Sequence, residues 1–418
     1  MRLFALRREE TGASAAMAAT VAWEDSDRPP REVRVEVAAP LAPALADDLD
    51  GFAVAAAVAA QHHGERRLLV EGTLCPRLAE GLEAATRLLA SWFPPAGAPP
   101  AIESSRGASP RVPPPAARAA VFVSGGLDSL FTGAQNRARY PRDHPASFRD
   151  AVVVEGYVFG GMSGSPRALD YWTRTRRAAT GFAKAAELET VFVRTNLRDL
   201  DDGLGFFAAK FHSAVLASVA HLLSRRISSV SIAADLDVPK LRAWGSHPVL
   251  DPLYSGSSLA VFHDGVETSR IEKAARIAAW PEALASLMVC TEGPLASGAL
   301  NCGRCEKCVR TLAALGPAAA AGASFERIDV TSRVIGRLRP GLHPWAVAAF
   351  WTDIAETFRS REKPDLAAAA EDFVRRAWVA DAWRLDRGWR GALRRFDRRC
   401  LGSALLRTSR RLRARRAG

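Results

Sequence analysis

AAVFVSGGLDS is the sequence of residues 119–129, and it decides the fold that we expect for this chain of 418 residues. The apolar run from Ala119 to Val123 is typical of a strand buried on both faces of a parallel sheet. It leads into two glycines, which permit a tight turn, and then into a helix-like stretch from Asp128 to Arg139. Such a turn places the free N–H groups and the positive dipole end of a helix where an anion can bind.

The segments after this stretch alternate between strand-like and helix-like patterns. Strands are predicted at 119–123, 151–159, 190–194 and 227–234, and helices at 128–139, 167–187 and 205–224. This alternation indicates a parallel sheet with helices on both faces. We therefore expect an α/β fold with a Rossmann-like sheet, whose ligands bind at the carboxyl ends of the strands.

Composition predicts a division of the chain into four segments. Residues 1–93 are expected to form a small N-terminal α/β domain, with a strand at 32–37 and a helix at 78–92. Residues 94–118 contain eight prolines and are expected to be a linker. The sheet domain covers 119–316. Residues 317–418 are expected to be a helical extension, with tryptophan-rich helices at 345–359, 366–378 and 383–395.

Most of the net charge of +12 lies in the C-terminal tail, where Arg384 to Gly418 contain thirteen arginines and two aspartates. This tail could bind nucleic acid. The whole chain, however, has fifty-one arginines against six lysines, and such a bias can also follow from the base composition of a genome. The charge therefore indicates little about the function of the sheet domain.

The sequence contains no segment that predicts insertion into a membrane. The longest apolar run, Gly51 to Ala60, falls short of the ~20 residues that cross a bilayer. The first nine residues lack the apolar core and cleavage pattern of a signal peptide. We therefore expect a cytoplasmic protein without a transmembrane segment.

The string Ser124-Gly125-Gly126-Leu127-Asp128-Ser129 after a buried strand resembles the signature of the PP-loop ATP-pyrophosphatases. Taken alone, the same turn could be no more than a capped strand-helix connection. The resemblance implies an adenine nucleotide alpha hydrolase type of sheet and a loop that grips the outer phosphates of ATP while the α-phosphorus is attacked. Ser124 and Ser129 can donate hydroxyl hydrogen bonds, and Asp128 can hold Mg²⁺ or cap the helix. The glycine-lysine-serine end of a Walker loop is missing, which disfavours γ-phosphoryl transfer.

Four of the six cysteines, Cys290, Cys302, Cys305 and Cys308, lie within nineteen residues. Their spacing and the polar residues between them predict a closed site of four thiolates, for which structural Zn²⁺ is the expected occupant. An iron–sulfur cluster is the main alternative. Cys75 and Cys400 stand alone and are expected to be small buried residues.

With its phosphate loop and its four cysteines, the segment of about residues 119–316 resembles the 7-cyano-7-deazaguanine synthases. These are the nitrile-forming enzymes of queuosine-type biosynthesis. The resemblance implies an ATP-dependent ligase that forms a carbon–nitrogen bond: a small carboxylate is adenylylated and then attacked by ammonia or another amine. The two terminal segments depart from that family. Two alternatives remain, an RNA-modifying PP-loop enzyme and a nucleotide-binding protein without turnover. The candidate partners are a small-molecule substrate, nucleic acid at the tail and a second copy of the chain.

Further polar residues fall near predicted strand ends. Arg270 or Lys273, at a helix start, could reach ATP or substrate, and the compact charge of Lys273 makes it the favoured one. His247 and Asp251 could orient substrate or transfer protons, or form a structural turn. Four other residues have equally good structural explanations: Asn196, Lys210, His212 and Asp235. Met1 is followed by Arg2, without a cysteine nucleophile for a glutaminase, so nitrogen is expected to come from free ammonia or another amine.

Overall fold

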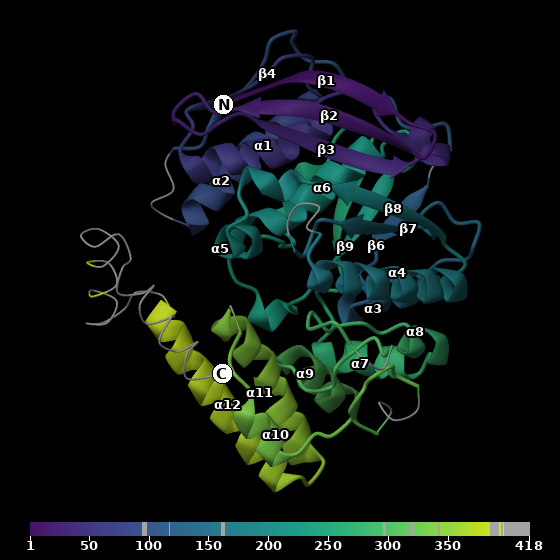
Figure 1. The fold of residues 1–418 in the computed structure, drawn as a ribbon, viewed down its shortest axis with the longest axis vertical. Helices are drawn as coiled ribbons and strands as arrows, with labels where there is room; N and C mark the ends of the chain where they lie inside the picture. Colours follow the sequence, from purple (N-terminus) through teal and green to yellow (C-terminus); the bar gives the residue numbers. More distant parts are fainter. Residues whose placement is uncertain are drawn as a thin grey trace. The chain divides into compact units, whose positions relative to one another are not determined.

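The computed structural model describes residues 1–93, 98–116, 118–159, 164–295, 298–317, 322–341 and 343–384, together with residues 393 and 396. They belong to two compact units. One comprises residues 1–302 and 315–326, and the other comprises residues 303–314 and the chain from residue 327 onward. The first unit contains the sheet and the second is helical (Figure 1).

Ten strands form a single, mostly parallel sheet in the order β10-β9-β6-β7-β8-β3-β2-β1-β4-β5. Five neighbouring strands are parallel: β10 (Ala260–Asp264), β9 (Ser229–Ala233), β6 (Ala119–Phe122), β7 (Phe148–Glu155) and β8 (Glu189–Thr195). Their order and direction confirm the predicted α/β class with a mostly parallel sheet, which is compatible with a Rossmann-like fold. Four of the five strands predicted from the sequence belong to this half, and the fifth, predicted at 32–37, lies in the N-terminal part of the sheet.

The sheet continues into the N-terminal part of the chain through an antiparallel junction. β8 pairs with β3 (Arg31–Ala38), with Val35 opposite Thr195. β2 (Ser14–Ala22) and β1 (Arg2–Glu10) follow as antiparallel strands. β4 (Arg67–Val70) and β5 (Ala101–Ser104) complete the sheet in parallel.

The predicted N-terminal domain and the predicted linker therefore both contribute strands to the main sheet. The compact unit spans both predicted boundaries. The physical reason is main-chain pairing. β3 forms hydrogen bonds with the open edge of β8, and β5 forms them with the open edge of β4. The nearby prolines do not prevent this pairing. Within the predicted linker, residues 94–97 and 117 lie outside the described part of the chain.

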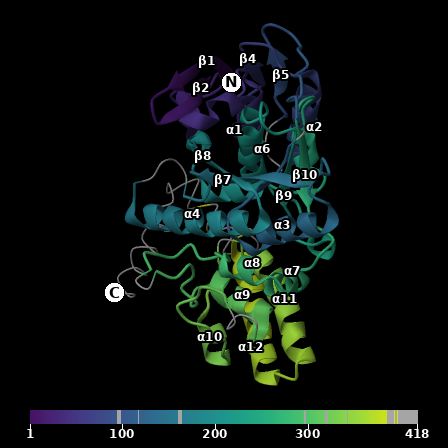
Figure 2. The same cartoon turned by 90° about the vertical axis from the view of Figure 1, so that its right-hand side faces the viewer.

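Helices cover the parallel half of the sheet on both faces, as Figures 1 and 2 show. α3 (Leu127–Arg139) and α4 (Pro166–Ala186) lie along one face, and α6 (His212–Leu222) lies along the other beside α1 (Asp50–His63). The apolar run noted in the sequence forms α1, whose residues 50–61 are all buried. In the described part of the chain, no helix has the length and apolar character needed to cross a membrane.

The remaining elements of the first unit are short, apart from α2 (Pro76–Trp92), which confirms the predicted helix at 78–92. The helix predicted at 205–224 is interrupted. It consists of α5 (Leu204–Phe206), the π-helical turn η3 (Phe207–Phe211) and α6. The others are α7 (Arg270–Ala278), α8 (Pro281–Ala285), and the 3₁₀ turns η1 (Ala39–Ala44), η2 (Leu197–Leu200), η4 (Val238–Lys240) and η5 (Asp251–Tyr254).

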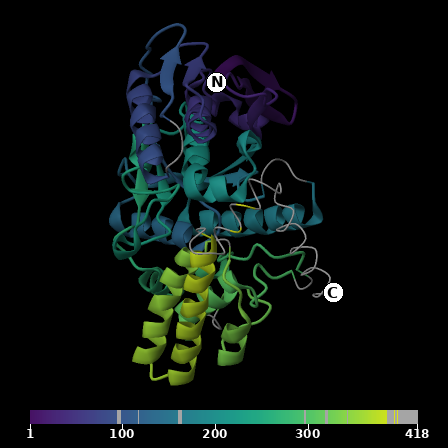
Figure 3. The same cartoon turned by 90° about the vertical axis from the view of Figure 1, so that its left-hand side faces the viewer.

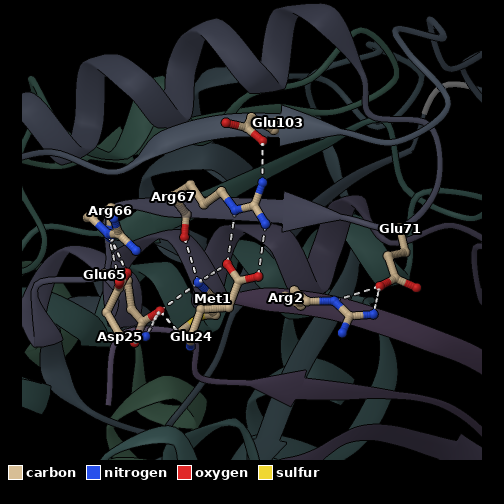
Figure 4. Close-up of polar contacts among 9 residues, drawn as sticks. All are labelled: Met1, Arg2, Glu24, Asp25, Glu65, Arg66, Arg67, Glu71 and Glu103. Atoms are coloured by element: carbon tan, nitrogen blue, oxygen red, sulfur yellow. Dashed lines mark hydrogen bonds and ion pairs between the residues drawn. The ribbon is translucent and has the colours of Figure 1, made fainter.

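Ion pairs join β1, β4 and β5 at this end of the sheet (Figure 4). The amino group of Met1 donates to Glu65 Oε2 at 2.6 Å and to the carbonyl oxygen of Arg67 at 2.8 Å. Arg67 in turn reaches Glu24 and Glu103. The hydrogen bonds from Arg67 lower the pKa of Glu24 to about 2. This network fixes the strands that the sequence did not predict.

The second unit contains α9 (Glu306–Leu315), α10 (Ser332–Arg337), α11 (Pro344–Ser360) and α12 (Pro364–Arg384), drawn in green to yellow in Figure 3. Trp351 is fully buried, packs on Phe373 with ring centroids 5.1 Å apart, and donates to Glu306 Oε1 at 2.9 Å. α11 and α12 confirm the predicted helices at 345–359 and 366–378. Most of the helix predicted at 383–395 lies outside the described residues.

Candidate phosphate site and cysteine cluster

The loop between β6 and α3 turns sharply at Gly125. Its φ is +78°, and a Cβ there would lie 3.0 Å from the Cβ of Ala178 and 3.2 Å from that of Met288. Gly126 precedes the helix with an ordinary extended backbone, at φ −69° and ψ 153°. Of the two glycines that suggested the turn, only Gly125 thus has a conformation that side chains rarely adopt.

Both predicted loop hydroxyls lie inside this turn. Ser124 Oγ accepts from the N–H of Gly126 at 3.2 Å, and the hydroxyl of Ser129 donates to the carbonyl oxygen of Gly126 at 2.9 Å. The two hydroxyl oxygens are 3.5 Å apart. Leu127, by contrast, is fully buried, so it can offer a ligand only its main-chain N–H at the start of the helix.

Asp128, in the first turn of α3, lies beside both predicted basic residues. Arg270 Nη1 donates to Asp128 Oδ2 at 2.9 Å, and Lys273 Nζ lies 3.7 Å from Oδ1. Lys273 is 1% exposed and also donates to the carbonyl oxygen of Ala234, just after β9, at 2.6 Å. The structure therefore brings Arg270 and Lys273 together at the loop, with the direct hydrogen bond made by Arg270.

The start of α7 explains why these two cations point to the loop. Ser269 and Glu272 form a capping box, in which the Ser269 hydroxyl accepts from the Glu272 N–H and the Glu272 carboxylate accepts from the Ser269 N–H. The box fixes the first helical turn, and Arg270 and Lys273, three residues apart, share one face of it. A cation pair held this rigidly can compensate the charge of a bound polyanion.

A cavity of about 220 Å³ opens beside the loop. Its walls include the ends of β6, β7 and β9, the loop residues Ser124, Gly126, Asp128 and Ser129, and side chains from α4 and α6. This is the edge at which parallel sheets bind ligands. Because Asp128 faces the cavity with 20% of its side chain exposed, it fits the single carboxylate that Mg²⁺ commonly uses together with phosphate oxygens.

Of the four polar residues with an alternative structural explanation, His212 and Asp235 also line this cavity. Burial lowers the pKa of His212, so its ring is neutral near pH 7. Asp235 accepts from Trp244 Nε1 at 3.1 Å. Asn196 instead joins β8 to β3 through hydrogen bonds to the backbone of Arg34 and Glu32. Lys210 lies against His62 and does not line the cavity.

The segment around His247 has a structural role in this fold. The buried carboxylate of Asp251 accepts from Ser246 Oγ at 2.6 Å and contacts His263 Nδ1 at 2.8 Å. The ring of His247 packs edge-on against Trp92, with centroids 5.0 Å apart. Neither His247 nor Asp251 lines the cavity, whereas Ser246 does. The structure thus favours the structural turn over proton transfer by this pair.

Sequence reasoning missed four cavity residues with polar side chains: Tyr157, Tyr171, Thr175 and Ser246. Tyr157 follows the end of β7 by two residues, so its position after a buried strand was a usable signal. Tyr171 and Thr175 are four residues apart on α4 and therefore share a face. The sequence of α4 shows an ordinary amphipathic pattern, so it does not reveal that this face lines a cavity.

The four predicted cysteine ligands come together. The Sγ atoms of Cys290, Cys302, Cys305 and Cys308 all lie within 4.8 Å of one another, and three of the four residues are buried. Four thiols at this separation match the donor set of a tetrahedral zinc site with no position open for water. The cluster can therefore hold zinc. Cys75 is buried next to Ser257, and Cys400 lies outside the described residues.

Two buried side chains position the segments that carry the first two cysteines. Arg174 on α4 donates to the carbonyl oxygens of Cys290 at 3.1 Å and Leu300 at 2.8 Å. Asn301 Oδ1 accepts from the N–H of Val289 at 2.8 Å, and its Nδ2 donates to the carbonyl oxygen of Leu287 at 2.7 Å. Both segments are thereby positioned by hydrogen bonds.

Gly303 is the other residue of this motif with a clear backbone role. Its φ is +68°, and a Cβ there would come within 1.9 Å of the carbonyl oxygen of Arg327. The glycine in the cysteine motif is thus required by a close backbone approach.

No protein-family model, no curated protein and no solved structure matches this chain.

Proposed function

We propose that this chain is an ATP-pyrophosphatase that adenylylates a small carboxylate and releases pyrophosphate. One observation carries the proposal: Asp128, Arg270 and Lys273 converge on a glycine turn at the carboxyl end of β6, beside a cavity. The loop supplies main-chain N–H groups at a helix start, and two fixed cations stand next to them. This combination suits a polyphosphate better than any other common ligand.

In the proposed reaction, the loop amides and the Ser124 and Ser129 hydroxyls hold the outer two phosphates. A carboxylate oxygen attacks the α-phosphorus, and the bond from that phosphorus to the bridging oxygen breaks. Pyrophosphate leaves with the electron pair of this bond, and Arg270 and Lys273 compensate its charge. Mg²⁺, held by Asp128 and phosphate oxygens, would withdraw charge from the leaving group.

The acyl adenylate then reacts with ammonia or another amine at its carbonyl carbon, the C–N bond forms, and AMP leaves. The carboxylate substrate is placed in the cavity, where Tyr157, Tyr171 and Thr175 provide an aromatic wall and a hydroxyl. A neutral His212 can accept the proton that ammonia or the amine loses as the C–N bond forms. The resemblance to 7-cyano-7-deazaguanine synthases is the basis for choosing nitrogen as the nucleophile.

We further propose that the cysteine cluster holds one structural zinc ion. Four thiolates complete the coordination of zinc, so the ion would fix the loop from Cys290 to Cys308 and leave the chemistry to the cavity.

Labelled ATP tests the reaction. The protein is incubated with Mg²⁺, ammonium and a panel of small heteroaromatic carboxylates that includes the substrate of the 7-cyano-7-deazaguanine synthases. ATP labelled at the α- or γ-phosphate is then followed by chromatography. We expect carboxylate-dependent AMP and pyrophosphate. Carboxylate-dependent ADP and phosphate would refute the assignment.

Two loop variants and a control accompany this assay. Asp128→Asn should slow pyrophosphate release, because it should raise the activation barrier by several kcal/mol, on the order of the charge stabilisation that a bound metal provides. Lys273→Met should weaken ATP binding. Asp143→Asn removes an exposed carboxylate outside the cavity lining and should leave both unchanged. ATP that binds equally well to all three variants would show that the loop is not the site.

A further inference from the structure

A second group of potential ligands lies far along the chain from the cysteines. His62 and His63 end α1, and Asp201 follows η2, all within the first compact unit. One ring nitrogen of each histidine and one carboxylate oxygen lie within 4.8 Å of one another. Two imidazoles and a carboxylate are a donor set that first-row divalent metals prefer.

The distances within this group are short enough for all three side chains to reach one ion after a small shift of His62. His63 Nε2 lies 3.1 Å from Asp201 Oδ2, and His62 Nε2 lies 3.9 Å from the same oxygen. Ligands bound at about 2.1 Å are separated by roughly 3.0–3.4 Å. His63 Nε2 is buried and faces the Asp201 carboxylate.

Aromatic neighbours hold both rings in place. His62 stacks on Phe206, with centroids 4.2 Å apart and planes 16° from parallel. His63 packs edge-on against Trp23 at 4.9 Å. Rings locked by packing lose little freedom when they bind an ion, which favours binding.

The carboxylate is positioned as well. Asp201 Oδ1 accepts from the N–H of Gly203 at 2.7 Å, which leaves Oδ2 directed to the histidines. On the other side, Lys210 Nζ lies 3.4 Å from His62 Nδ1. This contact uses the ring nitrogen that is not part of the ligand set, so His62 Nε2 remains for the ion.

We propose that His62, His63 and Asp201 form a binding site for one divalent transition-metal ion, of the class of Zn²⁺, Co²⁺ or Ni²⁺. Three protein ligands leave at least one coordination position for water or another small ligand. The site shares no residue with the phosphate loop or with the cysteine cluster, and it does not depend on the proposed reaction. It would tie the end of α1 to the segment between η2 and α5.

Cobalt is a suitable probe, because its absorption depends on the ligand type. The full-length protein first receives one equivalent of Zn²⁺ to fill the cysteine cluster, and it is then dialysed against Co²⁺. Bound cobalt is measured by elemental analysis and by its visible spectrum. We expect one cobalt per chain with visible bands and without the near-ultraviolet charge-transfer band that thiolate ligands produce.

Matched variants locate the ion. Asp201→Asn keeps the Oδ1 acceptor for Gly203 and removes the charged ligand, so cobalt affinity should fall at least tenfold. Asp199→Asn makes the same change two residues away, on an exposed side chain, and should bind cobalt as the wild type does. Lys210→Met should bind cobalt at least as tightly, because a neighbouring positive charge is removed.

Three results would overturn the proposal. One is a wild-type protein that takes up no cobalt beyond the cysteine cluster at a large excess of the metal. Another is an Asp201→Asn variant with wild-type affinity. The third is a thiolate charge-transfer band that grows in step with all of the bound cobalt.

Discussion

Gly125 controls the path of the phosphate loop through one backbone angle. Gly125→Ala should cost about 1–2 kcal/mol, because an L-residue at φ +78° is strained and the added Cβ meets Ala178. The loop would relieve this strain by turning its N–H groups away from the anion. We therefore expect ATP affinity, measured by calorimetry, to fall more than the melting temperature. Gly12→Ala, where no atom lies within 4 Å of the new Cβ, is the control. Unchanged ATP affinity in Gly125→Ala would contradict this role.

Asp48 offers a test of electrostatics at the start of α1. Burial raises its pKa to about 6, and the nearby Asp50 carboxylate acts in the same direction. The folded chain therefore keeps a proton that the unfolded chain has released above about pH 4. Ionised Asp48 destabilises the fold above pH 6, and this cost disappears as the pH falls toward 4.

Asp48→Asn removes that cost. The variant should be more stable than the wild type at pH 7, with a melting temperature higher by a few degrees, roughly the effect of 1 kcal/mol in a unit of this size. The difference should vanish near pH 4, where the wild-type carboxyl is protonated. Asp27→Asn, an exposed site, should show no such pH-dependent difference. Equal stabilisation by Asp48→Asn at both pH values would argue for a cause other than ionisation.

Among the elements, the strands and helices around the phosphate loop were predictable, and so was β3, whereas the strands β1, β2, β4 and β5 were not predicted. β6, β7, β8 and β9 are short apolar runs between helical patterns, which the sequence distinguishes well. β2 reads SAAMAATVA, and an alanine-rich run of this kind suits a buried helix as well as a buried strand. Its partners, β1 and β3, settle the question through pairing that is visible only in three dimensions.

In the candidate sites, too, some residues were predictable from the sequence and others were not. Loop residues and cysteines are close in sequence, so their spacing alone predicted that they would meet. Arg270 lies 142 residues from Asp128, and its hydrogen bond depends on how α7 packs against α3. Tyr157, Tyr171 and His63 carry no sequence motif. Their roles follow from which strand end or helix end faces them.

The crossing of α1 and α6 depends on a glycine in the buried helix. A Cβ on Gly51 would lie 2.6 Å from Leu222 Cγ and 2.8 Å from the carbonyl oxygen of Ser218. Gly51→Ala should therefore lower the free energy of unfolding by about 1–3 kcal/mol, despite the better helix propensity of alanine. Gly205→Ala has open space around the new Cβ and should not lower it. Urea denaturation of both variants measures the effect, and equal stabilities would show that the helices can separate at no cost.

The cysteine cluster predicts a link between metal and stability at the start of α9. Purified protein should contain close to one zinc per chain, and Cys305→Ser should lose most of it together with several degrees of melting temperature. A strong chelator should lower the stability of the wild type in the same way. Cys400→Ser makes the same chemical change at a lone cysteine and should keep the metal. Iron with sulfide, or no metal, in anaerobically purified protein would contradict the zinc assignment.

In the whole molecule, the cavity and the excess positive charge lie in different parts of the chain. Every residue that lines the cavity lies between Phe122 and Ser246, in the first compact unit. Arg270 and Lys273 belong to the same unit. The arginines from Arg384 onward account for nearly all of the net charge of +12. The chemistry and the charge thus belong to different parts of the chain.

A chain that ends at Trp383 should therefore keep its carboxylate-dependent pyrophosphate release, because it loses no residue of the loop, the cavity or the basic pair. If the tail binds RNA, the full-length protein should retain it at low salt and release it steeply as salt rises, since each neutralised phosphate frees a counterion. The truncated chain should lose this retention while its ATP turnover stays the same. Filter binding across a salt series and the labelled-ATP assay measure the two properties on one preparation. A truncated chain that is folded by circular dichroism but inactive would show that the arginine-rich tail contributes to the catalytic site.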